Sequence, residues 1–321
     1  MTGIVIITYN SAAVIDACLS ACLSLQNVAI VVVDNASQDN TVALVRCRPG
    51  VQLIPNLANR GFAGAANQGI NAAAGETVLL LNPDAIPLAG VDALAQAALL
   101  PEVGAVGGKL VNQDGTAQTG FNVRRFPTGL TLGLEVLGIN RLWPGNPVNR
   151  NYRMKLPDVP ADVDQPAGAF LMIRRAAYQA IGGFDERFFP IWFEDVDFCL
   201  RLKSAGYRIL YEPAAVAKHV GGHSANRISW ESKQLFWYGS LLTYGWKHLS
   251  TASGCALSFA VILGCVPRMI WGLTVTRSIE PIAVYSRVVL LASRYLREGA
   301  RGTSYSVAGT PPSPGSGAVR M

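Results

Sequence analysis

Short apolar runs alternate with segments of helical spacing along the first third of the chain. Five of these runs are continuous and rich in β-branched residues, which is typical of strands buried on both faces. They are residues 3–8, 29–33, 51–54, 77–81 and 104–111. The predicted helices among them are residues 14–25, 41–47 and 88–100. Strand alternating with helix at this spacing predicts a doubly wound, mostly parallel α/β sheet.

A glycine-rich stretch, residues 59–69, is predicted to be a turn, followed by a short helix of small residues that ends at Ala74. Because glycine lacks a Cβ, Gly61 and Gly64 can bring the backbone close to a ligand. The alternative is a tight turn beside a close helix–strand contact. A dinucleotide fingerprint is excluded, since G-x-G-x-x-G would have to follow the first strand directly, and no P-loop sequence occurs either.

Polar residues follow three of the predicted strands. They are Thr8-Tyr9-Asn10, Asp34-Asn35 and Asn82-Pro83-Asp84. Any one of these groups could simply end a strand or cap a helix. In doubly wound sheets, however, ligands bind beyond the carboxyl ends of the strands. Three such groups in consecutive units therefore predict a ligand site at this edge of the sheet.

Three carboxylates lie among aromatic residues farther along the chain, at Glu194, Asp195 and Asp197. Burying them unpaired is unfavourable, so they indicate an ion pair, a metal site or proton transfer. They also suit the first turn of a helix, where Asp197 could pair with Arg201 four residues later. We interpret Asp197 and Arg201 as structural, and Glu194 and Asp195 as candidates for chemistry.

The second half of the chain is less regular. Residues 118–166 are rich in Pro, Asn, Arg and aromatic residues, and such a long irregular segment predicts a binding or lid function. Short strands are predicted at 168–173, 207–211 and 214–218, and a helix at 174–181.

After Ser229, helices are predicted at residues 230–249 and 283–296. Between them lie two apolar segments, 251–266 and 269–275, which Pro267 and Arg268 separate. Residues 251–266 carry no charge but fall short of the roughly 20 residues that a membrane span needs. Arg268 would be unfavourable in mid-bilayer, whereas Trp246 and Trp271 suit an interface. We expect an in-plane or re-entrant membrane contact; a helical bundle or subunit interface is the alternative. The Gly/Ser/Pro-rich tail, 299–321, is predicted to be disordered.

Composition narrows the function classes. Half of the 321 residues are hydrophobic and 15% are charged, which excludes a disordered chain and permits membrane contact. The net charge of +6 is modest and no Lys/Arg run occurs, so we expect no nucleic-acid partner. Six cysteines without a C-x-x-C pair indicate a reducing compartment, and the N-terminus is predicted to be a strand rather than a signal peptide.

Several motifs occur together and in order. They are Ile6-Ile7-Thr8-Tyr9-Asn10, Val33-Asp34-Asn35-Ala36-Ser37-x-Asp39, Gly61-Phe62-Ala63-Gly64-Ala65-x-Asn67-x-Gly69, Leu81-Asn82-Pro83-Asp84, Gly182-Gly183-Phe184-Asp185-Glu186-x-Phe188-Phe189 and Phe193-Glu194-Asp195-Val196-Asp197. In these motifs the chain resembles glycosyltransferase family 2 enzymes of the rhamnosyltransferase-like branch. The resemblance covers residues 3–224 and implies a GT-A fold. Together with the predicted C-terminal helical, membrane-associated appendage, it suggests four regions: a nucleotide-sugar-binding half at 1–112, an acceptor and catalytic half at 113–229, helices at 230–298 and a tail at 299–321.

The resemblance also implies roles for single residues. Asp195 would be the catalytic base of a Glu194-Asp195 pair, and Asp84 and His219 would hold Mg²⁺ or Mn²⁺, with His223 a weaker candidate. The implied nucleotide-binding residues are Thr8, Tyr9, Asn10, Asp34, Gly61, Phe62, Asn67 and Asn82. Asn82 departs from the family pattern, because many relatives have an aspartate at this position and asparagine supplies no charge. The affinity for the metal could therefore be lower. Hard cations, however, need few carboxylates beside phosphate oxygens.

These inferences predict an inverting, metal-dependent glycosyltransferase. It would move a rhamnose-type sugar or similar hexose from a nucleotide diphosphate to a glycan or polyprenyl-linked acceptor in cell-surface polysaccharide assembly. We expect it in the cytoplasm, peripheral at the inner face of the plasma membrane. The alternative is a non-catalytic nucleotide-sugar-binding or scaffold protein with a degraded site at Asn82.

Overall fold

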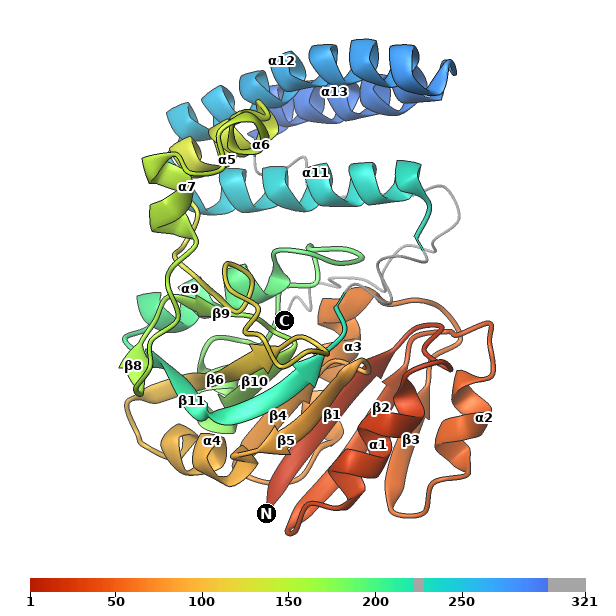
Figure 1. The fold of residues 1–321 in the computed structure, drawn as a ribbon, viewed down its shortest axis with the longest axis vertical. Helices are drawn as coiled ribbons and strands as arrows, with labels where there is room; N and C mark the ends of the chain where they lie inside the picture. The colour runs from red at the N-terminus through yellow and green to blue at the C-terminus, as the bar shows by residue number, and fades with distance from the viewer. Residues whose placement is uncertain (222–227, 300–321) are drawn as a thin grey trace, which may run out of the picture.

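The computed structural model describes residues 1–221 and 228–299, and a central sheet of nine strands organises them (Figure 1). The strands are β1 (Thr2–Thr8), β2 (Val28–Asp34), β3 (Val51–Pro55), β4 (Thr77–Leu81), β5 (Ala85–Ala89), β6 (Val103–Val111), β8 (Ala161–Asp162), β10 (Phe170–Arg174) and β11 (Arg208–His219). Eight of them follow the order β3-β2-β1-β4-β10-β6-β11-β5, and β8 pairs with β11. Only β5, β8 and β10 run against the common direction of the described strands. The mostly parallel, doubly wound sheet is therefore confirmed.

Helices cover both faces of the sheet. One face packs against α1 (Ile15–Leu23), α2 (Thr41–Arg46) and α4 (Val91–Ala98). The other packs against α3 (Gly61–Ala72), α8 (Arg175–Ala180) and α9 (Glu194–Ser204). Within β1, Ile4 and Ile6 belong to the first core, and Val5 and Ile7 to the second. Burial on both faces explains why the strands are continuous apolar runs.

The glycine-rich stretch is helical, which corrects the turn predicted for residues 59–69. Helix α3 begins at Gly61, and Gly69 approaches the sheet so closely that a Cβ would lie 2.4 Å from Cγ1 of Val5 and 3.0 Å from Cγ2 of Val33. Small residues let the helix pack tightly on the strands, and this packing outweighs the low helix propensity of glycine.

Two other predicted boundaries are wrong. The helix predicted from residue 88 begins at Val91, because the preceding residues pair with β11 as strand β5. The two strands predicted at 207–218 are one strand, β11, whose register against β6 shifts between Glu212 and Val216. Pro213, which has no N–H, lies at this irregularity, so the sequence alone suggested a break there.

The segment between β6 and β10 folds into short elements of its own. Strands β7 (Val123–Arg124) and β9 (Gln165–Pro166) pair, and between them lie α5 (Gly129–Val136), α6 (Ile139–Leu142) and α7 (Pro147–Tyr152). Side-chain caps begin two of these helices, since Thr128 accepts from the N–H of Thr131 and Asn146 from the N–H of Asn149. We call residues 118–166 the inserted segment.

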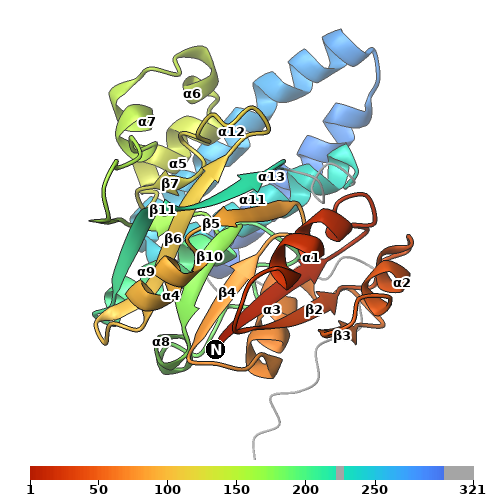
Figure 2. The same cartoon turned by 60° about the horizontal axis from the view of Figure 1, so that its bottom comes forward.

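Three long helices form a separate layer beyond the sheet (Figures 1 and 2). They are α11 (Trp230–His248), α12 (Thr251–Thr276) and α13 (Glu280–Glu298), and they share a third core with α5. Helix α12 continues through Pro267, so the expectation of a short apolar segment is wrong. By length and composition α12 could cross a membrane. An 18-residue stretch of the helix has a mean hydropathy of 1.7, and 28% of that stretch is buried inside the protein. Of the predicted tail, residues 300–321 lie outside the described residues.

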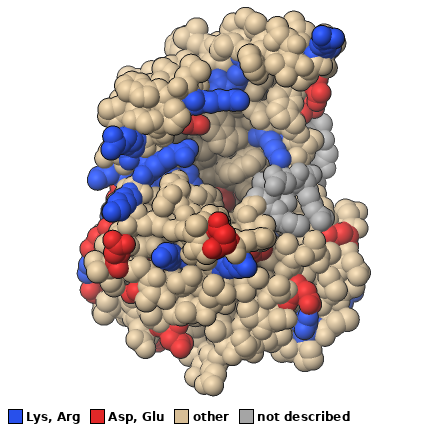
Figure 3. All heavy atoms as spheres, viewed as in Figure 1, with Lys and Arg blue, Asp and Glu red and all other residues tan. Residues whose placement is uncertain are grey.

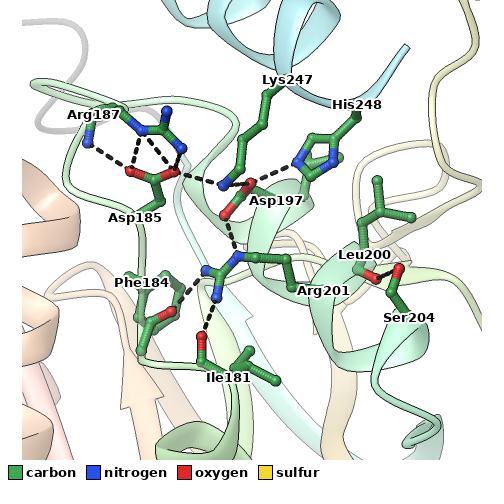
Figure 4. Close-up of polar contacts among 12 residues, drawn as sticks. Ile181, Phe184, Asp185, Arg187, Asp197, Leu200, Arg201, Ser204, Lys247 and His248 are labelled. Carbon is green, nitrogen blue, oxygen red and sulfur yellow. Dashed lines mark hydrogen bonds and ion pairs between the residues drawn. The ribbon is translucent and has the colours of Figure 1, made fainter. Parts of the chain in front are cut away.

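An ion-pair network joins this layer to the sheet domain (Figure 4). Oδ2 of Asp197, on α9, accepts from Nε of Arg201 at 2.8 Å, which confirms the structural pair predicted from the sequence. Oδ1 of the same carboxylate, which is fully buried, contacts Lys247 and lies 2.6 Å from Nε2 of His248, both at the end of α11. Lys247 also contacts Asp185 at 2.5 Å. The network therefore anchors α11 directly to the helix that begins with Glu194.

Candidate active site

A cavity of about 760 Å³ lies at the carboxyl ends of the first strands. Its wall is formed by the strand ends, the turn before α9, the inserted segment and α11 (Figure 3 shows the hollow between the two layers). Asp84 and Asp195 both line it. Carboxylates that are 111 positions apart in the sequence thus meet in one cavity.

Asp84 and His219 lie at one end of the cavity because β5 and β11 pair. Asp84 immediately precedes β5, and His219, the last residue of β11, is paired with Ala85. Nε2 of His219 lies 3.4 Å from Oδ1 of Asp84, and both side chains are buried. The ring of His219 also stacks on Phe121 of the inserted segment, with centroids 5.6 Å apart.

Hydrogen bonds determine which nitrogen of His219 carries the proton. The amide nitrogen of Gln118 donates to the carbonyl of His219 at 2.8 Å and to Asn112 at 3.0 Å, so its oxygen must be the atom 3.0 Å from Nδ1. Nδ1 therefore donates to Gln118, and a neutral ring keeps its lone pair on Nε2. Nε2 is buried without a hydrogen-bond partner and faces an oxygen of Asp84.

This arrangement fits a divalent cation. An imidazole lone pair and a carboxylate oxygen converge on one point, and the outer hydrogen bond to Gln118 orients the ring as in metal sites. Among the described residues no group of three His, Cys, Asp or Glu side chains occurs, and phosphate and water oxygens could supply further ligands. The weaker candidate, His223, lies outside the described residues.

Asp195 lies at the start of α9, where backbone groups hold its carboxylate. Oδ1 accepts from the N–H of Val196 at 2.8 Å, and Oδ2 accepts from the N–H of Gly168 at 3.1 Å. The amide of Gln165 lies 3.5 Å from Oδ2. The two residues directly before the helix, Trp192 and Phe193, have positive φ angles of 80° and 67°. Residues other than glycine rarely adopt this conformation, and where they do they are often at functional sites.

Glu194 differs from its neighbour in being almost fully buried. Burial, and then the negative charge of Asp195, raise the pKa of Glu194 well above its ordinary value. Its Oε2 has no hydrogen-bond partner. The raised pKa of Glu194 favours its neutral form, and both side chains of the pair line the cavity.

Of the residues expected to bind the nucleotide, four line the cavity. They are Tyr9, Asn10, Phe62 and Asn82. Asn35, at the end of β2, lines it as well, with its amide bonded to Asn59 at 2.8 Å and to the carbonyl of Gly61 at 3.1 Å. Asparagine side chains at adjacent strand ends thus form one polar wall, as the strand-end pattern predicted.

The other four lie behind this wall. Asp34 is buried and accepts from Thr8 at 2.8 Å and from the hydroxyl of Ser37 at 2.5 Å. Asn67 donates to the carbonyl of Phe184 at 2.9 Å and accepts from Tyr178 at 3.0 Å. A Cβ at Gly61 would lie 2.8 Å from Cδ2 of Phe189, so this glycine permits the close approach of a protein loop. The contacts of these residues lie within the protein, and their part in nucleotide binding stays a prediction.

The sequence reasoning did not single out several residues of the site. Gln118 orients His219, Gly168 and Gln165 hold Asp195, and Arg124 lines the cavity. Three of the four belong to the inserted segment, whose Arg, Asn and aromatic content had indicated a binding function. The composition thus located the segment, but the individual contacts depend on where its chain folds back.

Comparisons with known proteins agree with this geometry. Residues 3–181 match the family model described as glycosyl transferase family 2, and residues 151–221 match one described as the N-terminal domain of galactosyltransferase. An N-acetylglucosaminyl-diphospho-decaprenol L-rhamnosyltransferase of Mycobacterium tuberculosis (strain ATCC 25618 / H37Rv) is 34% identical over 242 residues, which cover 70% of this chain and 77% of the relative. A rhamnosyltransferase of Escherichia coli (strain K12) is 35% identical over 123 residues, 37% of this chain and 41% of the relative.

Solved structures share the fold. A mannosyltransferase from Pyrobaculum calidifontis in complex with GDP-Man and Mn2+ has a TM-score of 0.52 at 18% identity, covering 94% of this chain and 83% of that chain. S. aureus TarS in complex with UDP-GlcNAc has a TM-score of 0.52 at 16% identity, covering 94% of this chain and 88% of that chain. The GT-A fold is therefore confirmed, and the family matches favour an enzyme over the non-catalytic alternative. From its sequence and its structure, the chain belongs to glycosyltransferase family 2 and is a glycosyltransferase.

Proposed function

We propose that this enzyme moves a rhamnose-type sugar or similar hexose, with inversion, from a nucleotide diphosphate to a polyprenyl-diphosphate-linked sugar. The observation that carries the proposal is the shared cavity, with the Asp84–His219 pair at one place on its wall and Asp195 at another. The names of the M. tuberculosis and E. coli relatives supply the sugar, and the former supplies the lipid-linked acceptor class. Cell-surface polysaccharide assembly is the setting in which such a product is used.

Asp195 is the proposed base. Each carboxylate oxygen has two lone pairs, so Asp195 can accept the acceptor hydroxyl while the N–H groups of Gly168 and Val196 keep it in place. As the hydroxyl oxygen attacks the anomeric carbon, its proton passes to Asp195 and the bond from that carbon to the diphosphate oxygen breaks. The raised pKa of Glu194 favours a neutral carboxyl group, which adds no second negative charge beside the base.

The donor is proposed to lie along the strand ends. Asp84 and His219 would hold Mg²⁺ or Mn²⁺, which when bound neutralises the charge that develops on the leaving diphosphate. Tyr9, Asn10 and Phe62 would contact the nucleotide, and Asn82 could accept from the ribose or from a metal-bound water. Thr8, Asp34, Gly61 and Asn67 would support these contacts from behind.

We further propose that α12 lies in the plane of the cytoplasmic membrane surface. Its inner stripe, which includes Leu257, Val261 and Cys265, is buried in the helical layer. Its outer stripe is apolar and exposed at Phe259, Leu263, Val266 and Ile270, which recur every three or four residues. Arg268 donates to the carbonyl of Gly264 at 2.7 Å and also to that of Val136, which keeps its charge on the protein side. A helix apolar on one face and packed on the other suits peripheral contact.

The test is a donor and acceptor screen with the purified full chain. UDP-, dTDP- and GDP-sugars are offered with Mn²⁺, Mg²⁺ or chelator, and a short-chain prenyl diphosphate N-acetylglucosamine serves as acceptor. Product stereochemistry is determined by NMR. We expect inverted product only with a divalent cation, and expect Asp195→Asn to lower kcat by roughly 10²- to 10⁴-fold with donor affinity unchanged. A retained anomeric configuration, or full turnover in Asp195→Asn, would refute the mechanism.

A further inference from the structure

Two arginines of the inserted segment line the active-site cavity beside the catalytic base. Among the described residues of the cavity wall, Arg124 and Arg153 are the two permanent cations, and neither forms an ion pair within the described part of the chain. Figure 3 shows Lys and Arg side chains gathered beside the hollow, near α7. Cations that face a cavity without a carboxylate partner indicate an anionic ligand.

The environment of Arg124 is fixed by the fold. Its guanidinium lies over the rings of Phe121, at 5.4 Å, and Tyr152, at 6.0 Å, and its Nη1 is 3.4 Å from the Tyr152 hydroxyl. Its Nε is buried yet has no hydrogen-bond partner. Contacts with two aromatic rings thus hold a planar donor group at the cavity wall, where it can bind a planar or tetrahedral oxyanion.

Arg124 adjoins both pairs of the site: its guanidinium lies over Phe121, which stacks on His219, and its strand partner contacts Asp195. In the β7–β9 pair Arg124 lies opposite Gln165, whose amide is 3.5 Å from Oδ2 of Asp195. Arg153 follows α7 directly, and its aliphatic stem packs against Gly120. Both arginines therefore belong to the segment that surrounds the base, where the acceptor hydroxyl must lie.

Exposed apolar side chains lie on the elements next to the two arginines. Helix α7 packs against α5, and α5 packs against α12. Leu142 and Trp143, just before α7, are 86% and 61% exposed, and Leu130 of α5 is 61% exposed. Exposed apolar side chains thus lie on the elements that connect the segment of the two arginines to α12. A sugar linked through a diphosphate to a polyprenyl chain offers a matching set of groups: a hydroxyl for the base, an anion for the arginines and an apolar chain for the exposed side chains.

We propose that Arg124 and Arg153 form a subsite for the diphosphate of the lipid-linked acceptor, separate from the donor diphosphate at Asp84 and His219. The inference rests on the proposed acceptor class. Two diphosphates in one cavity repel each other, and a pair of arginines offsets this repulsion for the second one. The subsite would also distinguish a diphosphate-linked sugar from a neutral glycoside, because only the former carries an anion for the guanidinium groups of Arg124 and Arg153.

Equilibrium binding tests the subsite without requiring turnover. Calorimetry measures the affinity of a short-chain prenyl diphosphate N-acetylglucosamine, and of the matching alkyl glycoside, for the wild type, Arg124→Met, Arg153→Met and Arg125→Met. Arg125 is the matched control, because it is the next residue in the chain, exposed and not part of the cavity wall. Melting temperatures verify that each variant is folded.

We expect Arg124→Met to weaken binding of the diphosphate ligand roughly 10- to 100-fold, with a smaller loss in Arg153→Met and none in Arg125→Met. Affinity for the alkyl glycoside and for the free nucleotide should not change. Equal binding of the diphosphate ligand by the wild type and Arg124→Met, or loss of nucleotide affinity instead, would overturn the subsite even if the enzyme transfers sugar. Selective loss would establish it even if the transferred sugar differs from the one proposed.

Discussion

The backbone N–H of Gly168 donates a hydrogen bond of 3.1 Å to Oδ2 of Asp195. The contact is possible because residue 168 has no side chain, since a Cβ there would lie only 3.2 Å from Cβ of Asp195. A loop that leads from β9 to β10 thus sets the position of a carboxylate on α9. The base and the group that orients it come from elements joined only through the tertiary fold.

Gly168→Ala should lower kcat about tenfold, because a displacement of a few tenths of an ångström moves Asp195 out of line with the acceptor hydroxyl. Donor affinity should remain as in the wild type. Gly133→Ala is the matched control, since no atom lies within 4 Å of a Cβ at that position in α5. Steady-state kinetics with both substrates measure the effect. Equal kcat values in the two variants would argue against a positioning role for Gly168.

Glu194→Gln should leave most of the activity and raise stability at neutral pH. The folded-state pKa of Glu194 lies above its unfolded value, so its carboxyl contributes stability that is fully present below the unfolded pKa, near 4.3, and is lost as pH rises through the folded pKa. Glutamine mimics the neutral form at every pH. Melting temperatures from pH 4 to 8 should therefore diverge in favour of the variant as pH increases. A variant less stable than the wild type at pH 8 would show that Glu194 is ionised in the folded protein.

Removing the partner of His219 should weaken metal binding. In Gln118→Leu, Nδ1 loses its acceptor at 3.0 Å and the ring is free to change tautomer, so we expect Mn²⁺ affinity to fall roughly 10- to 100-fold in the presence of nucleoside diphosphate. His219→Ala should lose at least as much. Gln113→Leu, on the exposed turn nearby, serves as control. Calorimetric titration with Mn²⁺ makes the measurement, and unchanged affinity in both Gln118→Leu and His219→Ala would exclude this end of the cavity as the metal site.

The buried ion pair between Asp197 and Arg201 should contribute far more to the free energy of unfolding than an exposed ion pair with the same spacing. Asp197→Asn leaves Arg201 and Lys247 without their counter-charge and should lower the free energy of unfolding by about 3 kcal/mol. The control, Glu298→Gln, breaks the exposed pair with Arg294 and should cost about 0.5 kcal/mol. Urea unfolding compares the two, and equal losses would mean that the network does not stabilise the joined layers.

The same ion-pair network should make the stability of the folded protein sensitive to acid. Burial alone would raise the pKa of Asp197, but the hydrogen bond with His248 and the charges of Arg201 and Lys247 outweigh it and hold the pKa below the ordinary value. The stability that the carboxylate contributes is present above its unfolded pKa of about 3.9 and is lost as pH falls through the lower folded value. Asp197→Asn should therefore differ most from the wild type near neutral pH and least in strong acid.

Charged substitutions on the outer stripe of α12 should release the enzyme from membranes. Leu263→Glu combined with Ile270→Glu should lower partition onto anionic phospholipid vesicles at least about tenfold, since burial of each side chain contributes roughly 1.5–3 kcal/mol. Leu57→Glu, at an exposed position between β3 and α3, is the control. Vesicle sedimentation gives the readout. Unchanged partition of the double variant would place membrane contact elsewhere or remove it.

The sequence alone was sufficient for the parts of this protein that repeat a local pattern. Continuous β-branched runs such as residues 3–8 can be satisfied only between two layers of helices, so they determined the doubly wound sheet. Because parallel strands end at one edge, the polar residues after β1, β2 and β4 could be assigned to a common site. At the start of α9, Asp197 forms the predicted pair with Arg201, and the two candidates for chemistry, Glu194 and Asp195, line the cavity.

Only the tertiary structure decided the features that depend on contacts between residues far apart in the sequence. Gly69 favours a turn by local propensity, yet its lack of a side chain lets α3 pack on β1, and packing determined the helix. Pro267 suggested an end to α12, but the packed helices around it maintain one continuous helix. Likewise, neither the tautomer of His219 nor the hydrogen bonds that hold Asp195 have a local signature. They arise because the inserted segment brings Gln118 against His219, and because the loop between β9 and β10 brings Gly168 against Asp195.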